Sequence, residues 1–423
     1  MENTEILKQG ISKIVAEDRP PSGSKEADNQ DKLDEIGWAK SNDRYRMDSD
    51  KLLWHLDRVK DWTQGERVAP LHIDMGIVNG CNLGCVFCYG VVQGRKGFLG
   101  KRGGMQMMPL EKVMSVFSDA KKAGVRSINI DGSGENTLNP ALYPSIEHAR
   151  NIDLDVSLAT HGANLFNTKN IQSLLTSLQW LRINISAATP ESYEIVHQRK
   201  WLDRVIRNTE HLVKGKKVKG YRNGKNLETT IGFQMVLGDK NIDDIVPLAK
   251  LGRDMGIDYT VIKPTSDTPD GKLNVCFDKY LELVDIFKEA QSYSNENYEV
   301  IVKWKKMGNM GNKVYNKCHG TRFIIAIEGD GAIFPCGHWF NIERERFLMG
   351  NVNETSLAEI FRGDQYWKVQ DEIHKLDLRY CQSNCRQHGV NLTLDEIATE
   401  SDPVSYVDSL EVPSEEPEHI NFV

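Results

Sequence analysis

The sequence predicts an α/β protein, in which a partial, TIM-like (β/α)6 barrel is followed by a small α+β domain with a β-hairpin. From residue 71 onward, apolar β-branched runs alternate with segments of helical periodicity. This alternation is typical of parallel strands joined by right-handed crossovers. After residue 264 the alternation stops, and Gly329-Asp330-Gly331 separates two short apolar runs. That pattern predicts a hairpin.

The expected barrel strands are short and apolar, and the segments between them repeat apolar residues at helical spacing. Side chains that do chemistry in such a barrel lie at the carboxyl ends of its strands. A helix at 278–291 and a hairpin of residues 323–328 and 332–334 are expected afterwards. The barrel strands are predicted at 71–78, 126–131, 154–160, 181–186, 229–237 and 259–263, and the helices at 110–123, 141–150, 168–178, 190–213 and 242–255.

Four regions are expected along the 423 residues. Residues 1–66 form a polar, partly flexible N-terminal extension with a helix near residues 51–65, because Pro, Gly and Ser interrupt its first part. Residues 67–270 form the barrel and residues 271–390 the small domain, and residues 391–423 form an acidic C-terminal tail.

The net charge of −7 belongs to the C-terminal end of the chain, since nine acidic residues and no Lys or Arg follow Arg386. The remainder is close to neutral, which does not predict a nucleic-acid surface. No apolar run is long enough to span a membrane, and the N-terminus lacks the pattern of a signal peptide. We therefore expect a cytoplasmic protein that binds neither nucleic acid nor membrane.

Eight cysteines in a cytoplasmic chain indicate metal or redox chemistry rather than disulfides. Cys81, Cys85 and Cys88 lie within eight residues, directly after the first expected strand. Structural zinc prefers four ligands in two close pairs, and no fourth cysteine is near. An iron–sulfur cluster with one open iron fits this loop better, and zinc is the alternative.

The C-x3-C-x2-C spacing, with Phe87 before the last cysteine, resembles that of the radical S-adenosylmethionine (SAM) enzymes. The resemblance implies that Cys81, Cys85 and Cys88 hold a [4Fe–4S] cluster whose fourth iron binds SAM. It implies that SAM is cleaved to methionine and a 5′-deoxyadenosyl radical, which takes a hydrogen atom from the substrate. An external electron donor such as flavodoxin or ferredoxin is also implied.

Three further segments at strand ends support this resemblance, which covers about residues 67–265. The turn after the second strand is similar to the family's Gly-Gly-Glu-Pro motif, with Asn136 in place of Pro. The third strand ends in Thr-His-Gly, where the family often has Thr-Asn-Gly, and the fourth ends at a serine. The residues that the resemblance implies in SAM binding are Phe87, Gly132, Ser133, Gly134, Glu135, Thr160 and Ser186.

A second group, Cys318, Cys336, Cys381 and Cys385, surrounds and follows the hairpin. It resembles the auxiliary-cluster domain of the SPASM/Twitch subgroup. Four cysteines instead of seven imply the shorter Twitch form, with one auxiliary [4Fe–4S] cluster and no open iron. A structural zinc site is the alternative. We expect the cluster either to accept an electron from the substrate or only to brace the substrate pocket.

Cys276 belongs to neither group. It is expected either to be a small buried residue or to return a hydrogen atom to a substrate radical, as thiols do in radical epimerases. A donor thiol favours epimerisation, and its absence favours dehydrogenation. The glycine-rich loop at residues 94–104 carries four cations, which are either solvated or ordered around an anionic substrate.

Three functions stay open at this point. The first is a radical SAM oxidoreductase or epimerase that acts on a small polar substrate, such as a sugar, aminocyclitol or nucleotide-linked sugar. The second is a peptide-modifying (RiPP) maturase, and the third is a zinc-stabilised scaffold without catalysis. Residues 1–66 are too short and polar for a leader-binding winged helix, which favours the small substrate.

Overall fold

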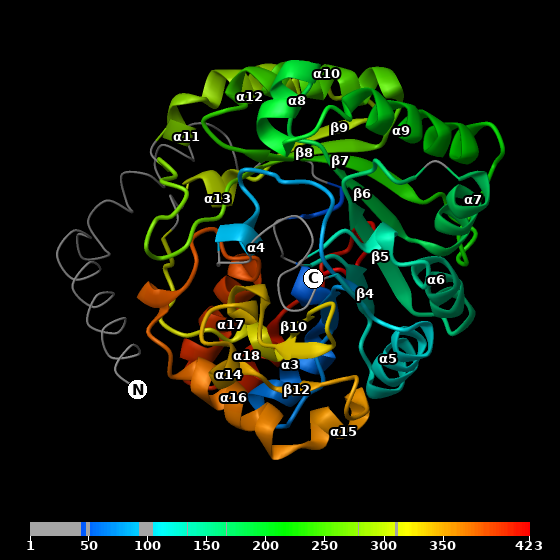
Figure 1. The fold of residues 1–423 in the computed structure, drawn as a ribbon. Coiled ribbons are helices and arrows are strands. Elements are labelled where there is room, and N and C mark those ends of the chain that lie inside the picture. The colour runs from blue at the N-terminus through cyan, green and yellow to red at the C-terminus, as the bar shows by residue number, and fades with distance from the viewer. Residues whose placement is uncertain are drawn as a thin grey trace, which may run out of the picture.

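The computed structural model describes residues 44–47, 51–92, 105–132, 134–165, 167–277, 279–308 and 312–423. A ten-stranded sheet runs through it in the order β12-β11-β10-β1-β4-β5-β6-β7-β8-β9 (Figure 1). A separate pair joins β2 (Val78–Asn79) to β3 (Gln106–Met107). The large sheet contains β1 (His72–Met75), β4 (Ser127–Ile130), β5 (Asp155–Thr160), β6 (Trp180–Asn184), β7 (Thr230–Leu237), β8 (Tyr259–Pro264), β9 (Glu299–Val302), β10 (Ile324–Ile327), β11 (Ala332–Phe334) and β12 (Gly350–Asn351).

The six predicted barrel strands are β1 and β4 to β8, and each pairs in parallel with its neighbour. The partial barrel is therefore confirmed. Two expected helices are each divided. Helix 190–213 is two helices, because Gln198 adopts a left-handed backbone with φ of 59° that ends the first, and helix 278–291 is divided at Leu283. The helices between the strands are α5 (Leu110–Ala123), α6 (Leu142–Asn151), α7 (Thr168–Ser177), α8 (Pro190–His197), α9 (Leu202–Lys217) and α10 (Ile245–Met255).

The sheet continues beyond the barrel at both edges. β9 pairs in parallel with β8, and the sequence pattern did not predict this strand. β10 and β11 form the predicted antiparallel hairpin, but β10 also pairs in parallel with β1. All four residues of β10 are buried, as expected for a strand that is covered on both faces.

The two faces of the barrel sheet differ in polarity because side chains alternate along a strand. Ile73 and Met75 on β1, and Ile128 and Ile130 on β4, are fully buried in the main hydrophobic core. Helices ring this outer face (Figure 1); α5, for example, buries Phe117 and three smaller apolar residues. The intervening residues, such as Asp74 and Asn129, are polar and hydrogen-bonded to each other.

Helices also form in the segment that was expected to be an acidic tail, namely α17 (His388–Thr399) and α18 (Pro403–Ser409). The last residues then return to the amino ends of the barrel strands. His419 stacks on Trp180 with 4.9 Å between ring centroids, and the Asn421 carbonyl accepts a hydrogen bond from Ser127. This end of the barrel is thus filled by protein, and the opposite end carries the cysteine loop.

The remaining helical elements have between three and eleven residues. They are η2 (Lys51–His55), α3 (Leu56–Thr63), α4 (Tyr89–Val92), η3 (Asn136–Leu138), η4 (Ile242–Asp244), α11 (Lys279–Glu282), α12 (Val284–Gln291), α13 (Trp304–Gly308), η5 (Gly320–Arg322), η6 (Gly337–Phe340), α14 (Arg344–Phe347), α15 (Leu357–Arg362), α16 (Asp364–His374) and η7 (Leu378–Tyr380).

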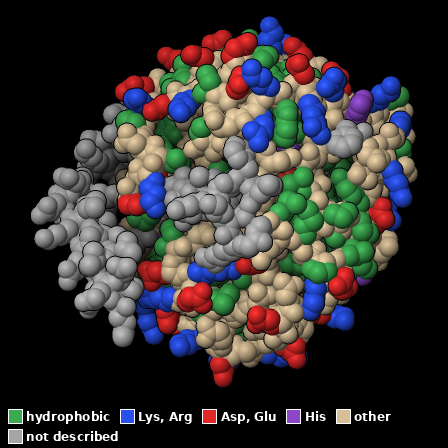
Figure 2. Space-filling view, viewed as in Figure 1, with side chains coloured by type: hydrophobic (Ala, Val, Ile, Leu, Met, Phe, Trp, Pro, Cys, Tyr) green, Lys and Arg blue, Asp and Glu red, His purple; other side chains and the backbone are tan. Residues whose placement is uncertain are grey.

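Positive and negative side chains are interspersed over the face shown in Figure 2. Within the described ranges, no helix has the length and apolar composition needed to cross a membrane.

Candidate active site

The cysteine loop connects β2 to α4 and brings three thiols together, as the sequence predicted. The Cys88 amide donates to the Cys85 carbonyl at 3.0 Å, and the Leu83 amide donates to Cys81 Sγ at 3.4 Å. Burial raises the pKa of the Cys85 thiol, and the nearby Cys88 and Cys81 raise it further. The three thiols therefore lie close to one another, and the Cys85 thiol stays protonated at neutral pH unless a metal binds it.

The donor set of this loop fits an iron–sulfur cluster, because thiolates are the usual ligands of such clusters. No group of three or more His, Cys, Asp or Glu side chains is arranged to hold a single metal ion, as far as the described ranges extend. In addition, the Tyr193 hydroxyl is buried without a hydrogen-bond partner, and Cys85, Glu135 and Cys81 raise its pKa beyond the effect of burial. The buried Tyr193 hydroxyl is therefore a hydrogen-bond donor available to a group that the three thiols hold.

The carboxyl end of α8 holds the cysteine loop in place. The Gly84 and Val86 amides donate to the carbonyls of His197 and Val196 at 3.3 Å and 3.0 Å. The His197 ring contributes too, because its Nδ1 lies 3.1 Å from Cys85 Sγ. Burial, with His161 nearby, lowers the pKa of His197 to about 3, so the ring is neutral.

His161, at the end of β5, supports the same loop from another side. Its Nδ1 accepts a hydrogen bond from the Ala163 amide at 3.0 Å, which leaves the ring proton on Nε2. Nε2 therefore donates to Asn82 Oδ1 at 2.7 Å, one residue after Cys81. Burial lowers the pKa of His161, although Glu135 opposes this effect.

The predicted glycine turn packs against the chain that leads into the cysteine loop. Gly132 has φ of +132°, and a Cβ there would lie 3.1 Å from the backbone of Gly76. A Cβ on Gly134 would overlap the carbonyl oxygens of Val78 and Gly80. Only glycine fits both positions, so the turn and the cysteine loop are fixed against each other. Ser133 lies outside the described residues.

Glu135 is buried and uses its carboxylate to join strand ends. Oε1 accepts hydrogen bonds from the Thr160 hydroxyl at 2.6 Å and from the amide and hydroxyl of Thr137. Oε2 accepts from the His161 amide at 2.9 Å. Because these donors occupy most of the carboxylate's acceptor capacity, the Glu135 side chain is arranged to hold the turn in place.

Of the other predicted SAM-binding residues, Thr160 and Ser186 lie at the expected strand ends and Phe87 lies in the cysteine loop. Thr160 is engaged with Glu135 and with the Gly162 amide at 3.1 Å. Ser186 is fully buried, and its hydroxyl accepts from the Val236 amide at 3.0 Å. The Phe87 ring meets the His197 ring edge-on, with centroids 5.8 Å apart.

Asn136, which stands where the family motif has Pro, ties the turn to the barrel. Its Oδ1 accepts from the Ile77 amide at 2.8 Å.

The second cysteine group is also brought together. Burial raises the pKa of Cys318 to about 12, with Cys385 and Cys381 adding to it. Burial likewise raises the pKa of Cys336, and the other three cysteines raise it further. Amides surround the group, since Asn391 Nδ2 donates to Cys318 Sγ at 3.7 Å and the Gln387 amide to Cys385 Sγ at 3.3 Å.

Comparison with known families decides what these two groups are. The model of the radical SAM superfamily matches residues 75–252, which include Cys81, Cys85 and Cys88. The SPASM model, an iron–sulfur cluster-binding domain, matches residues 318–386 and includes all four other clustered cysteines. The chain belongs to the radical SAM superfamily. Its cofactors are SAM and [4Fe–4S] clusters, as the sequence predicted.

Solved structures share the fold of this radical SAM protein at low sequence identity. SuiB from Streptococcus suis bound to S-adenosylmethionine is 16% identical, with a TM-score of 0.57 over 84% of this chain and 81% of that chain. SuiB bound to the precursor peptide SuiA is 15% identical, with a TM-score of 0.54 over 82% and 76%. Native anSMEcpe with bound AdoMet is 14% identical, with a TM-score of 0.50 over 81% and 100%. No curated protein matches the chain in sequence.

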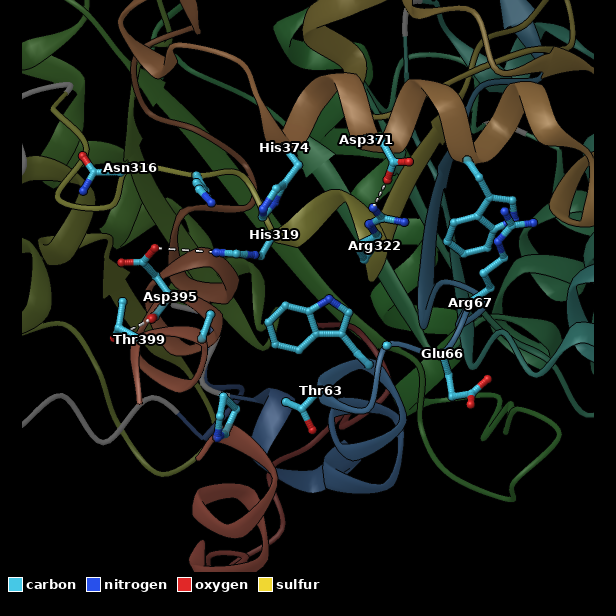
Figure 3. A pocket seen from close by; sticks show the side chains of 16 residues that line it. Thr63, Glu66, Arg67, Asn316, His319, Arg322, Asp371, His374, Asp395 and Thr399 are labelled. Atoms are coloured by element: carbon cyan, nitrogen blue, oxygen red, sulfur yellow. Dashed lines mark hydrogen bonds and ion pairs between the residues drawn. The ribbon is translucent and has the colours of Figure 1, made fainter. Parts of the chain in front are cut away.

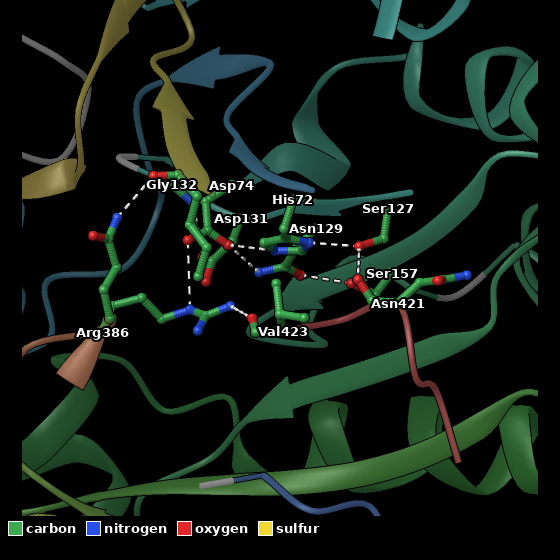
Figure 4. A network of polar contacts seen from close by, with 12 residues as sticks. His72, Asp74, Ser127, Asn129, Asp131, Gly132, Ser157, Arg386, Asn421 and Val423 are labelled. Carbon is green, nitrogen blue, oxygen red and sulfur yellow. Dashed lines mark hydrogen bonds and ion pairs between the residues drawn. The ribbon is translucent and has the colours of Figure 1, made fainter. Parts of the chain in front are cut away.

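The interior of the radical SAM barrel is lined by polar groups from several strands (Figure 4). Asp74 on β1 contacts His72 Nε2 at 3.1 Å, Asn129 Nδ2 at 3.2 Å and Arg386 Nε at 3.5 Å. The Ser157 hydroxyl on β5 donates to Asn129 Oδ1 at 2.8 Å. These contacts join strands β1, β4 and β5 to Arg386, which follows the SPASM cysteines.

Closer to the carboxyl ends of the strands, the interior is cationic. Arg182 on β6 reaches over β5 to pair with Asp131 at 3.0 Å, and its Nε is buried without a partner. Lys263 on β8 forms no hydrogen bond or ion pair with any described residue. Burial, with Arg182 nearby, lowers the pKa of Lys263 to about 8. Lys303 takes the neighbouring position after β9, because Ile262 pairs with Val302.

A cavity of about 650 Å³ lies beside the SPASM cysteines (Figure 3). His319, which follows Cys318, and Arg322 line it, together with residues of α3, α16 and α17. Two of its polar groups contact partners within the protein: Arg322 bonds Asp371 at 2.7 Å, and His319 lies 3.6 Å from Asp395. No residue of the cysteine loop or the glycine turn lines this cavity, so it is separate from the candidate active site.

Cys276 is exposed in the segment after β8, so the expectation of a small buried residue is wrong. Its role as a hydrogen donor stays a prediction. The basic loop at 94–104 lies outside the described residues. Sequence reasoning missed His197, Tyr193 and Lys263, which stand on regular elements without a motif around them.

Proposed function

We propose that this radical SAM protein oxidises a polar substrate that carries an anionic group. The observation that carries the proposal is Lys263, a cation in the barrel interior that forms no ion pair with any residue that the structure describes, although the charge of Asp131 acts on its pKa. Arg182 adds a buried N–H without an acceptor, and Asp131 is the carboxylate that pairs with it. A carboxylate or phosphate on the substrate would satisfy both donors, at the barrel end where chemistry is expected.

In this proposal, different residues of the chain bind the two clusters and SAM. Cys81, Cys85 and Cys88 hold the first cluster, and Cys318, Cys336, Cys381 and Cys385 hold the second. When bound, the first cluster supplies the electron that cleaves SAM to a hydrogen-abstracting 5′-deoxyadenosyl radical, and the second supplies a site that can take up an electron. The backbone of turn 132–134 and Ser186 bind SAM, and Glu135 keeps the turn in place. An external donor such as flavodoxin or ferredoxin delivers the electron.

Oxidation is preferred to epimerisation because the chain has a second, saturated thiolate group that suits electron uptake. Epimerisation needs a hydrogen donor near the substrate, and the exposed Cys276 is the candidate. A second proposed function is peptide maturation. It is supported by the fold that the chain shares with SuiB bound to the precursor peptide SuiA. The polar barrel interior by itself does not favour a small molecule over a peptide as the substrate.

The test uses anaerobic holoenzyme with SAM, a reductant and three matched probes: glucose, glucuronate and glucose 6-phosphate. We expect an anionic probe to stimulate 5′-deoxyadenosine formation more than glucose does. Comparing glucuronate with glucose 6-phosphate then shows whether the site prefers a carboxylate or a phosphate. Lys263→Met should reduce the preference about tenfold or more, the cost of losing a charged hydrogen bond. Lys288→Met, at an exposed position on α12, is the matched control.

Two results would contradict the substrate proposal. Equal stimulation by glucose and the two acids would remove the anionic requirement. If Lys263→Met binds SAM more weakly but is stimulated by the two acids as strongly as wild type, then Lys263 contributes to SAM binding and not to substrate binding. For peptide maturation, stimulation by short peptides and none of the sugars is the supporting result. Product that is lighter by two hydrogens identifies oxidation, whereas unchanged mass with one deuterium gained from D2O identifies epimerisation.

A further inference from the structure

His197 is the last residue of α8 and is 1% exposed. Its ring packs against Tyr193, with centroids 4.3 Å apart, and against the edge of Phe87. Both ring nitrogens have partners: Nε2 lies 3.0 Å from the Ser186 amide nitrogen, and Nδ1 lies 3.1 Å from Cys85 Sγ. The ring therefore links the predicted SAM-binding serine to a cysteine of the first group.

These partners fix the position of the ring proton. A backbone amide can only donate, so His197 Nε2 must accept the Ser186 N–H with its lone pair. A ring whose Nε2 keeps a lone pair is neutral and carries its one proton on Nδ1. Nδ1 faces Cys85 Sγ, so His197 donates an N–H···S hydrogen bond to that sulfur.

From this geometry we infer that His197 sets the reduction potential of the SAM-binding cluster through a hydrogen bond to Cys85. The inference rests on the proposed function in one respect, namely that Cys85 binds iron. Reduction adds negative charge to a cluster and its thiolates. A donor aimed at one sulfur stabilises the reduced state more than the oxidised state, and so raises the midpoint potential. His197 is thus a positioning residue that acts through Cys85.

The direction of the ring also explains why histidine serves here. The amide of Ser186 holds Nε2, and the carbonyl of His197 accepts from Gly84 in the same loop. One residue thus fixes the loop through its backbone and directs a proton at the sulfur through its ring. In the four-cysteine group, the side-chain donor to Cys318 is the amide of Asn391, at the longer distance of 3.7 Å.

Two variants separate this role from a structural one. In His197→Asn the amide nitrogen lies near the position of Nδ1 and can still donate to Cys85. In His197→Gln the amide lies near the position of Nε2, where it can accept from Ser186 but cannot reach Cys85. The measurement is an EPR-monitored redox titration of anaerobic holoenzyme, in which the first cluster is the one whose signal SAM perturbs.

We expect the midpoint potential of that signal to stay near the wild-type value in His197→Asn and to fall in His197→Gln. The second signal should not move in either variant. In wild-type enzyme grown with 15N-histidine, pulsed EPR should show a nitrogen coupling on the SAM-perturbed signal, and His197→Gln should lack it. This labelled wild-type measurement needs no variant to fold.

The inference is overturned if the potential is unchanged in His197→Gln, if His197→Asn falls instead, or if the labelled wild type shows no nitrogen coupling. These outcomes differ from a failure of the proposed function. If the three cysteines of the loop hold no cluster, wild-type enzyme shows no SAM-perturbed cluster signal at all, whereas equal stimulation by glucose and the two acids would contradict only the substrate proposal.

Discussion

The two cysteine groups are built in different ways. Cys81, Cys85 and Cys88 lie on one eight-residue loop, which buried imidazoles and the end of α8 hold from outside. The four SPASM cysteines come from three segments between residues 318 and 385, and amide groups of Gln387 and Asn391 contact them. The first group is encoded locally, whereas the second exists only when distant segments fold together. We therefore expect substitutions in the second group to lower the folding stability. Substitutions in the first group should abolish catalysis without lowering the stability.

The largest expected effect is the loss of SAM cleavage when Cys85 is replaced by Ala. One ligand of a three-ligand cluster is lost, so about four iron atoms per chain should disappear, while the SPASM group stays loaded. Iron and sulfide content and 5′-deoxyadenosine formation measure this. Cys276→Ala is the control and should keep both. Normal SAM cleavage by Cys85→Ala would show that the loop is not the cluster site.

Replacing both Cys381 and Cys385 by Ala should have the opposite effect: the second cluster is lost and the first is kept. SAM cleavage should persist, while substrate oxidation stops. Thermal stability should fall as well, because Ser383 and Asn384 between these cysteines bond to Asp267 and Thr265. Anaerobic thermal denaturation and iron content give the measurement. Full substrate turnover by a variant that has lost this iron would exclude an oxidative role for the second group.

Gly134→Ala tests whether the turn and the cysteine loop are fixed against each other. The new methyl group overlaps two carbonyl oxygens at residues 78 and 80, so the backbone must shift, at a cost of about 1–3 kcal/mol. SAM affinity, measured by equilibrium binding, should fall together with stability. Gly238→Ala is the matched control, since its Cβ meets only Thr265 at 3.4 Å. Unchanged SAM affinity in Gly134→Ala would detach the turn from SAM binding.

At Lys263 we expect a gain of stability instead of a loss of function, because burial and then Arg182 lower its pKa from 10.5 to about 8. Below pH 8, Lys263 is charged in both the folded and the unfolded state. The free-energy cost of burying this charge then destabilises the native protein by its largest amount. Between about pH 8 and 10.5 the unfolded state binds more protons, so rising pH stabilises the native state. Lys263→Met should therefore be more stable than wild type at pH 7, by up to about 3 kcal/mol.

That advantage should shrink as the pH rises toward 10, and anaerobic chemical denaturation at pH 7, 8.5 and 9.5 measures it. Lys288→Met should show a difference that does not change with pH. A constant difference for Lys263→Met as well would mean that Lys263 does not titrate in this range.

The barrel could be predicted from the sequence because each of its strands contains a local apolar run. The first cysteine group could be predicted because its three cysteines lie close together in the sequence, at a recognisable spacing. β9 could not be predicted, since four residues at 299–302 become a strand only by pairing with β8. The same holds for His197, which looks like an ordinary residue at the end of a helix. Its role depends on Cys85 and Ser186, which are distant in sequence and meet it only in the fold.

EPR of the reduced holoenzyme with and without SAM tests most directly whether Cys81, Cys85 and Cys88 hold the cluster that binds SAM. Wild-type enzyme is compared with a variant in which Cys81, Cys85 and Cys88 are all replaced by Ala. We expect two [4Fe–4S] signals in the wild type, of which SAM perturbs one, and we expect that signal to be absent from the variant. A SAM-perturbed signal that survives in the variant would show that these three cysteines do not hold the SAM-binding cluster.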